Sequence, residues 1–361
     1  MQTSPKRILW ADMLRILGVL MVIAMHAGDQ VVFSLWGKAP FKNDAIPSWW
    51  LTGVAYKSLV NMCVPLLFML SGYLLLSARD DILPFFKKRL PKILLPLFAW
   101  TVLYLWWDGA FAESASFPDL ILPPIKSFLA NSGHFHLWFL YALLGLYLVT
   151  PILRRFVQSA SDMELLYAIG IWFAASFVFE LFSHLTGYGL ALFAQPYISG
   201  FLGYYLAGYY LGRREYSAKT IWFAVALVIL SVAGKTLWAY SLTADGGKFD
   251  TNLFDYLKWH VVLLSLAGFI AFKCAAHFIE QRISPSVERI LVTVSKATFG
   301  IYLVHIMVLK FMNDGIFGFR LYTDSFHPLL AIPATALIAF IISFAIIYPL
   351  QKIPLLKKIV P

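Results

Sequence analysis

Long apolar stretches alternate with short polar segments along the whole chain. A helix needs about twenty residues to cross a hydrocarbon layer of about 30 Å. Stretches of that length lie at residues 9–27, 52–77, 93–112, 136–153, 163–183, 192–212, 220–240, 256–278, 290–312 and 328–350. The pattern therefore predicts an all-α polytopic integral membrane protein with about ten transmembrane helices.

The polar segments between these stretches contain residues that end helices. Examples are Gly37 to Pro40, the pair Pro123 and Pro124, Asp245 to Gly247, and His327 with Pro328. Proline and glycine interrupt helical hydrogen bonding, so we expect loops at these places. We expect one transmembrane domain over residues 1–361, without an appended soluble domain.

Composition agrees with a chain that is solvated by lipid. Of the 361 residues, 60% are hydrophobic and 13% are charged, whereas soluble domains carry about 25% charged residues. Cys63 and Cys274 lie inside apolar stretches, and we expect both to be free, buried thiols. Gly208 and Gly212 have the spacing of small residues that allows close packing of membrane helices.

The positive charge is distributed unevenly over the two sides of the predicted map. Of the 29 Lys and Arg residues, 19 lie on the side that holds both termini, nine lie on the other side, and Arg15 lies within the first span. Basic loops face the cytoplasm, so this skew predicts that both termini are cytoplasmic, which agrees with an even number of spans. The net charge of +10 thus indicates topology and contact with membrane lipids, and no nucleic-acid partner is expected.

The first apolar stretch contains three polar side chains that are costly in a bilayer: Asp12, Arg15 and His26. At about 100° per residue, the eleven residues from Arg15 to His26 place both on one helix face, about 16 Å apart along the axis. Asp12 lies one turn before Arg15, where the two side chains can pair. Intramembrane ionisable residues indicate function by default. The alternative is that Asp12 and Arg15 anchor the helix end and His26 is a satisfied buried histidine.

Five segments in order along the chain carry further polar or unusual residues. Arg15 and His26 are followed by an apolar run that ends in Phe68-Met69-Leu70-Ser71-Gly72-Tyr73, and then by a basic segment in which Arg89 and Lys92 precede Pro96. The last two segments are His136-Leu137-Trp138-Phe139-Leu140 and Gly300-Ile301-Tyr302-Leu303-Val304-His305. Together, from about residue 8 to residue 310, they resemble the acyltransferase 3 family of membrane-bound O-acyltransferases. Lys92 departs from the resemblance, because the family often has arginine there.

The resemblance implies transfer of an acyl group, usually acetyl, from cytoplasmic acyl-CoA to a hydroxyl of a glycan or glycolipid. It implies acetyl-CoA as the co-substrate, no metal, and a place in the bacterial inner membrane. For such a transfer, neutral His26 has the proton affinity of a general base at neutral pH. Arg15 remains protonated and supplies charge for the donor, and Asp12 completes the expected catalytic group.

The remaining candidates divide between the two substrates. On the donor side we expect Arg89, Lys92, Ser71 and Tyr73, whereas Lys87 and Lys88 are read as topology and lipid contacts. On the acceptor side we expect His136, Trp138, Tyr302 and His305. Ser71 with Gly72 also fits a helix-packing contact, His136 also fits an interfacial position, and Tyr302 with His305 also fits polar contacts between helices.

Other readings of the sequence remain open. A secondary transporter or a flippase of a lipid-linked glycan also carries buried charges within many helices. Within acyl transfer, His26 either activates the acceptor for direct attack or becomes acylated itself. The sequence leaves the acceptor, the acyl length, the side of the membrane where the acceptor is modified, and the oligomeric state undecided. No sequence pattern indicates a metal site, a phosphate-binding glycine loop or a nucleophile elbow.

Overall fold

The computed structural model describes residues 7–33, 47–109, 117–131, 133–186, 196–244 and 251–361. Its elements are α1 (Leu9–Phe33), α2 (Ser48–Val60), α3 (Cys63–Leu76), α4 (Ile82–Arg89), α5 (Pro91–Trp107), α6 (Phe117–Ala130), η1 (Phe135–Leu137), α7 (Trp138–Ser159), α8 (Asp162–Thr186), α9 (Pro196–Gly212), α10 (Ala218–Ala244), η3 (Thr251–Phe254), α11 (Trp259–Glu280), α12 (Pro285–Asn313), α13 (Pro328–Leu350) and η4 (Leu356–Lys358). These described residues form helices and no strands, which confirms the predicted all-α class.

Eight helical segments in the described part of the chain are long and apolar enough to cross a membrane. They are Leu9–Phe33, Ser48–Leu76, Ile82–Trp107, Phe135–Ser159, Ala218–Ala244, Thr251–Glu280, Pro285–Asn313 and Pro328–Leu350. The two other predicted spans, 163–183 and 192–212, correspond to α8 and α9. The protein is therefore a polytopic membrane protein, while the number of crossings and the side of the termini remain predictions.

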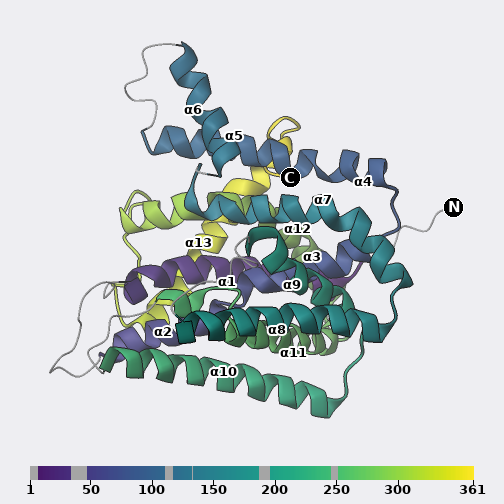
Figure 1. Cartoon of the computed structure of the whole chain (residues 1–361). Coiled ribbons are helices and arrows are strands. Elements are labelled where there is room, and N and C mark those ends of the chain that lie inside the picture. The colour runs from purple at the N-terminus through teal and green to yellow at the C-terminus, as the bar shows by residue number, and fades with distance from the viewer. Residues whose placement is uncertain (1–6, 34–46, 110–116, 132, 187–195, 245–250) are drawn as a thin grey trace.

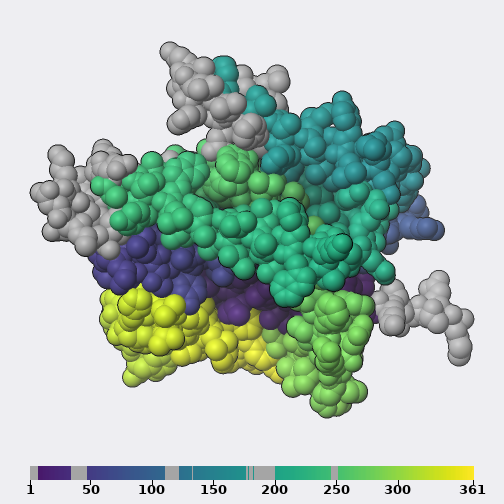
Figure 2. Space-filling view, turned by 90° about the horizontal axis from the view of Figure 1, so that it is seen from below, coloured from purple at the N-terminus to yellow at the C-terminus, as the bar shows by residue number. Residues whose placement is uncertain are grey.

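Helix α1 lies in the middle of the bundle (Figure 1), where it contacts α2, α3, α11, α12 and α13. Helix α10 lies at the outside of the bundle. Figure 2 shows α10 in green across one face, whereas α1, in dark purple, is visible there only as a narrow strip. Its outward side chains are large and apolar, among them Trp222, Phe223 and Leu230. A helix surrounded by other helices can hold polar side chains, whereas one that faces lipid is apolar. The polar residues of α1 thus lie where other helices can satisfy them.

The predicted second span is interrupted in the structure. We expected one helix over 52–77, but α2 ends at Val60, residues 61 and 62 form a turn, and α3 begins at Cys63. The physical reason is Pro65, which has no N–H for the carbonyl of Asn61 and whose ring clashes with that carbonyl. The interruption leaves Asn61 at the junction of the two helices.

Helices α3 and α9 approach closely through glycines. A Cβ atom added to Gly208 would lie 1.9 Å from the carbonyl oxygen of Met69, and one added to Gly72 would lie 1.9 Å from that of Tyr205. Gly212 lies against the ring of Tyr73 in the same interface. The expected packing role of Gly208 and Gly212 is confirmed, and Gly72 takes part in the same contact.

One of the expected loops is a helix instead. Pro123 and Pro124 lie inside α6, so the prediction that they interrupt helical structure is wrong. Proline fixes φ close to its helical value, so consecutive prolines keep the helical shape while they remove two N–H donors. The segments around Gly37 to Pro40 and Asp245 to Gly247 lie outside the described residues.

Candidate active site

Asp12 is the centre of a charged network at the start of α1. Its carboxylate accepts hydrogen bonds from Arg7 (2.5 and 3.0 Å), from Arg15 (3.0 Å) and from the Ser295 hydroxyl (2.6 Å). The expected pairing of Asp12 with Arg15 is confirmed, and Arg15 also donates to Ser295 at 2.9 Å. With its oxygens occupied by donors, Asp12 is arranged to hold the arginines in place. It is poorly placed to take a proton.

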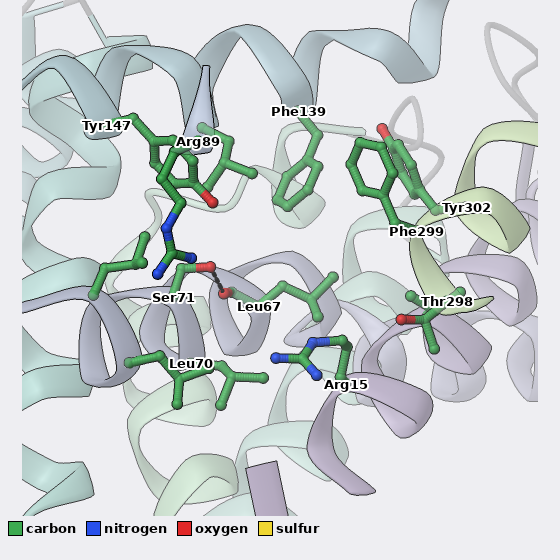
Figure 3. A pocket seen from close by; sticks show the side chains of 14 residues that line it. Arg15, Leu67, Leu70, Ser71, Arg89, Phe139, Tyr147, Thr298, Phe299 and Tyr302 are labelled. Atoms are coloured by element: carbon green, nitrogen blue, oxygen red, sulfur yellow. Dashed lines mark hydrogen bonds between the residues drawn. The ribbon is translucent and has the colours of Figure 1, made fainter. Parts of the chain in front are cut away.

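Arg15 and Arg89 enter one cavity from different helices. Figure 3 shows the guanidinium group of Arg15, from α1, and that of Arg89, from α4, on facing walls of this space. The cavity has a volume of about 200 Å³, and we call it the arginine cavity. Its remaining walls are mainly apolar and include Leu67, Leu70, Leu143, Phe139, Phe299 and Tyr302. Two cations beside an apolar wall suit a ligand with an anionic and an apolar part.

The other donor-side candidates lie in different surroundings. Ser71 lines the arginine cavity and donates to the carbonyl of Leu67 at 2.8 Å. Lys92 is exposed and does not belong to the cavity wall. Tyr73 packs against the ring of Trp10, with 4.9 Å between the ring centroids. The structure thus brings Arg15, Arg89 and Ser71 together, and it leaves Lys92 and Tyr73 outside the group.

A buried arginine holds the segment that leads to Arg89. Arg154 of α7 donates to the carbonyl of Leu75 at 2.8 Å and to that of Asp80 at 2.9 Å. Its guanidinium group also lies 4.6 Å from the centroid of the Phe85 ring. These contacts fix the turn between α3 and α4. Nothing near Arg154 in the chain indicates these partners, so the sequence alone predicts only a basic residue at the end of a span.

Farther along α1, His26 belongs to a second polar group. Its Nδ1 lies 3.1 Å from a carboxylate oxygen of Asp29, and the Nζ of Lys57 donates to the other oxygen. Because the carboxylate of Asp29 can only accept a hydrogen bond, Nδ1 of neutral His26 carries the proton and Nε2 is the unprotonated nitrogen. Asp29 and Lys57 are not among the site residues expected from the sequence. The spacing of three residues between His26 and Asp29 would have identified Asp29, whereas the Lys57 contact between α1 and α2 has no local signal.

Four of the eight histidines of the chain form one cluster of rings around His26. The ring centroids of His26 and His305 are 5.4 Å apart, as are those of His136 and His305. His134 joins through its Nδ1, 2.8 Å from the Nδ1 of His136. Burial lowers the pKa of His134, which precedes the span Phe135–Ser159, so its ring is neutral at pH 7. Sequence analysis missed His134, and it left an interfacial His136 open, whereas His136 is only 2% exposed.

Tyr302 lies between the histidine cluster and the arginine cavity. It lines that cavity, its hydroxyl donates to the backbone carbonyl of His136, and its own carbonyl accepts from the Nδ1 of His305 at 2.5 Å. Its ring centroid is 5.4 Å from that of Phe139. The Nε2 atoms of His136 and His305 are buried with no hydrogen-bond partner among the described residues. Tyr302 therefore forms part of the wall between the arginine cavity and the histidine cluster.

Beyond this wall, His26 and Asp29 line two further cavities. The larger has a volume of about 480 Å³ and also includes Lys57, Asn61 and Trp138; we call it the histidine cavity. The smaller has a volume of about 290 Å³ and includes Phe135 and Tyr322. Burial raises the pKa of Tyr322 to about 12, so its hydroxyl is neutral. Trp138 thus lines the same cavity as His26.

The described residues contain no group of three or more His, Cys, Asp or Glu side chains arranged to hold a metal ion. The side chains of the two polar groups offer proton transfer at imidazole and binding of anions at arginine.

One of three comparisons with known proteins identifies the family of the chain. Searches among curated proteins and among solved structures gave no match. The chain matches the acyltransferase 3 family, described as an acyltransferase domain, over residues 8–348, which is nearly its whole length and contains every residue of the two polar groups except Arg7. The protein therefore belongs to the acyltransferase 3 family and is a membrane acyltransferase.

Proposed function

We propose that the protein transfers an acyl group, acetyl in the simplest case, from acyl-CoA to a hydroxyl group of a glycan or glycolipid. The observation that carries this proposal is the hydrogen-bonded group of His26, Asp29 and Lys57. It lines a cavity that is separate from the arginine cavity. A base in one cavity and an anion-binding site in another suit a reaction with two different substrates.

The arginine cavity is the proposed donor site. Phosphate groups of CoA bind well to guanidinium groups, which offer charge and several N–H donors. Arg15 is held from behind by Asp12 and Ser295, and Arg89 has a buried Nε without a partner among the described residues. The apolar walls suit the pantetheine arm, and Tyr302 with Phe139 marks the end toward His26.

The histidine cavity is the proposed acceptor site. The acceptor hydroxyl loses its proton to Nε2 of His26 while its oxygen attacks the thioester carbonyl. Asp29 fixes the tautomer and stabilises the imidazolium that forms, and Lys57 balances the carboxylate. The thiolate of CoA leaves and takes up a proton, so the products are an ester and free CoA.

Two routes fit this site. In the first, the acceptor oxygen attacks the thioester directly, and His26 acts as a base. In the second, Nε2 of His26 attacks first and carries the acyl group to the acceptor. Rapid quenching with radiolabelled acetyl-CoA, followed by mass spectrometry of the protein, separates them, because only the second route leaves the label on His26.

The proposed location is a bacterial plasma membrane, with the arginine cavity opening to the side that contains acyl-CoA. Arg89 belongs to residues 79–92, the loop segment with the most basic residues, and basic segments face the cytoplasm.

Two experiments test this proposal. In the first, the purified protein in liposomes is given acetyl-CoA, and the release of free thiol is measured with and without cell-surface glycans. In the second, mass spectrometry compares glycans from cells with and without the protein. We expect acceptor-dependent thiol release and a gain of one acetyl group on one glycan. His26→Gln keeps size and hydrogen bonding but takes up no proton, and it should be inactive while melting like the wild type. His277→Gln, an exposed histidine, is the matched control. Transport of a glycan without thiol release would instead support a transporter.

A further inference from the structure

The histidine cavity combines an aromatic surface with polar groups. The ring of Trp138 stacks on that of Phe201, with 5.5 Å between centroids and 30° between planes, and Tyr256 lies 5.8 Å from Trp138. All three residues line the cavity together with His26 and Lys57. Aromatic rings held rigidly in this way offer an apolar surface with low entropy cost on binding. The C–H face of a sugar ring fits such a surface.

Asn61 contributes a buried carboxamide to the same cavity wall. The residue is 1% exposed, and neither its Nδ2 nor its Oδ1 has a hydrogen-bond partner among the described residues. A buried carboxamide without partners destabilises the folded state unless a ligand or water satisfies it. The amide offers both a donor and an acceptor, which is the pattern that a sugar hydroxyl complements.

The position of Asn61 in the fold also indicates a ligand. It lies at the interruption between α2 and α3 that Pro65 causes, one helical turn after Lys57. Interrupted helices at membrane depth occur where the backbone is buried in protein or lines a water-filled cavity. Through Lys57 and Asp29, the same face of α2 is connected to His26. Asn61 is therefore close to the base but is not part of its hydrogen-bonded chain.

We propose that Asn61 and Trp138 form a subsite for a pyranose ring of the acceptor, in which Asn61 binds the hydroxyl next to the one that is acylated. This inference rests on the proposed function, and it narrows the acceptor to sugars that carry two neighbouring free hydroxyl groups. Trp138 supports the face of the ring, Asn61 sets its rotation, and His26 takes the proton of the reacting hydroxyl. Asn61 thereby determines which hydroxyl of the ring is acylated.

The test compares two substitutions that remove unsatisfied polar groups. Asn61→Leu has nearly the same size and no hydrogen-bonding groups. Thr335→Val is the matched control, because Thr335 of α13 is fully buried, has no partner for its hydroxyl among the described residues, and lines none of the three cavities. Both variants should melt at or above the wild-type temperature, since neither loses a hydrogen bond within the protein.

Binding is measured by saturation-transfer NMR on the protein in nanodiscs, with methyl glycopyranosides of glucose, galactose, mannose and rhamnose and their monodeoxy analogues as probes. We expect at least one parent glycoside to bind the wild type, and to bind Asn61→Leu about tenfold more weakly or worse, with Thr335→Val unchanged. Removing the neighbouring hydroxyl should weaken binding to the wild type by a similar factor but should have no further effect on Asn61→Leu.

Three results would overturn the subsite: no glycoside binds the wild type, Asn61→Leu binds as the wild type does, or the deoxy penalty is the same in both proteins. Thiol release from acetyl-CoA, measured on the same preparations, reports separately on the proposed function. Normal release by the wild type together with any of these three results contradicts only the subsite. A wild type that binds sugars but releases no thiol contradicts the acyltransfer and leaves the sugar site in place.

Discussion

At the scale of residues, His26, Asp29 and Lys57 form one unit in which each side chain determines the state of the next. Lys57 donates to the carboxylate that orients the imidazole. The carboxylate therefore serves two purposes: it selects the His26 tautomer, and it compensates a lysine that is only 5% exposed. Substitutions of Asp29 and Lys57 should separate the effect on the His26 tautomer from the effect on the buried charge of Lys57.

Asp29→Asn should lower the turnover number by about two orders of magnitude. The new amide can donate to Nδ1, which favours the His26 tautomer with its proton on Nε2, where it cannot accept another. Lys57 would lose its partner, so the melting temperature should also fall. The double substitution Asp29→Asn with Lys57→Met should restore melting without restoring turnover. Recovery of turnover in the double variant would show that Asp29 acts only through stability.

Arg89→Ala should raise the KM for acetyl-CoA by about tenfold to a hundredfold and leave the KM for the acceptor unchanged. The reason is that hydrogen bonds to charged groups contribute about 1.5–3 kcal/mol. Lys87→Ala, which removes an exposed charge from the same helix, is the control for general loss of positive charge. Steady-state kinetics with each substrate varied in turn gives both constants. A change in the KM for the acceptor alone would contradict the assignment of Arg89 to the donor site.

The burial of His134 makes stability depend on pH. Its pKa is lowered from 6.5 in the folded protein, so the unfolded chain binds the proton more readily. Stability contributed by this residue is therefore present above pH 6.5 and is lost as the pH falls toward the folded-state pKa. We expect the melting temperature of His134→Gln to vary less with pH between about pH 7 and pH 5 than that of the wild type. His277→Gln, at an exposed position, should keep the wild-type slope.

At the scale of elements, glycine contacts and a proline interruption shape the part of the bundle that carries both cavities. Helix α3 contributes Leu67 and Ser71 to the arginine cavity, and the turn before it contributes Asn61 to the histidine cavity. Its position is set by α9, which approaches so closely that Gly208 touches the α3 backbone. Packing in this interface thus positions side chains of both proposed substrate sites.

Gly208→Ala should lower the melting temperature of the detergent-solubilised protein and reduce activity with both substrates. The added Cβ would meet the Met69 carbonyl oxygen at 1.9 Å, and overpacking of this kind costs about 1–3 kcal/mol. Gly170→Ala in α8 is the control, because an added Cβ there has no atom within 4 Å. That control should be neutral or slightly stabilising. Equal melting temperatures for the two variants would contradict the close α3–α9 packing.

At the scale of the whole molecule, contacts between α1 and α12 show that these helices run in the same direction. Arg15 contacts Ser295 near one end, and His26 contacts His305 farther along both helices. Parallel helices cross a membrane in the same sense, so residues before α1 and before α12 should lie on one side. This agrees with the basic skew of the sequence.

Reporter fusions or cysteine labelling test this topology. Positions Asp81, Arg155, Arg214 and Glu288 should report the cytoplasm, because they belong to the side with 19 basic residues. Positions Asp44, Ser116 and Gly247, which lie outside the described residues, should report the opposite side. Two or more reversed positions would contradict the arrangement of ten spans, and with it the assignment of the arginine cavity to the cytoplasmic side.

The sequence by itself determined the membrane class, the approximate positions of the helices and the pairing of Asp12 with Arg15. These features are local: apolar length defines a span, and a spacing of three residues on a helix defines a contact. The interruption of the second span was not predicted, although its cause is also local: the effect of Pro65 reaches only four residues back to Asn61.

Only the tertiary structure decided which helix faces meet. In lipid, apolar side chains cover the outside of the bundle as well as its interior, so hydrophobic periodicity does not indicate which face of a helix packs inward. Sequence therefore could not predict that Lys57 reaches Asp29, that His26 lies against His305, or that Arg15 and Arg89 share a cavity. Each of these contacts joins residues from different elements, and each depends on how closely the helices between them pack.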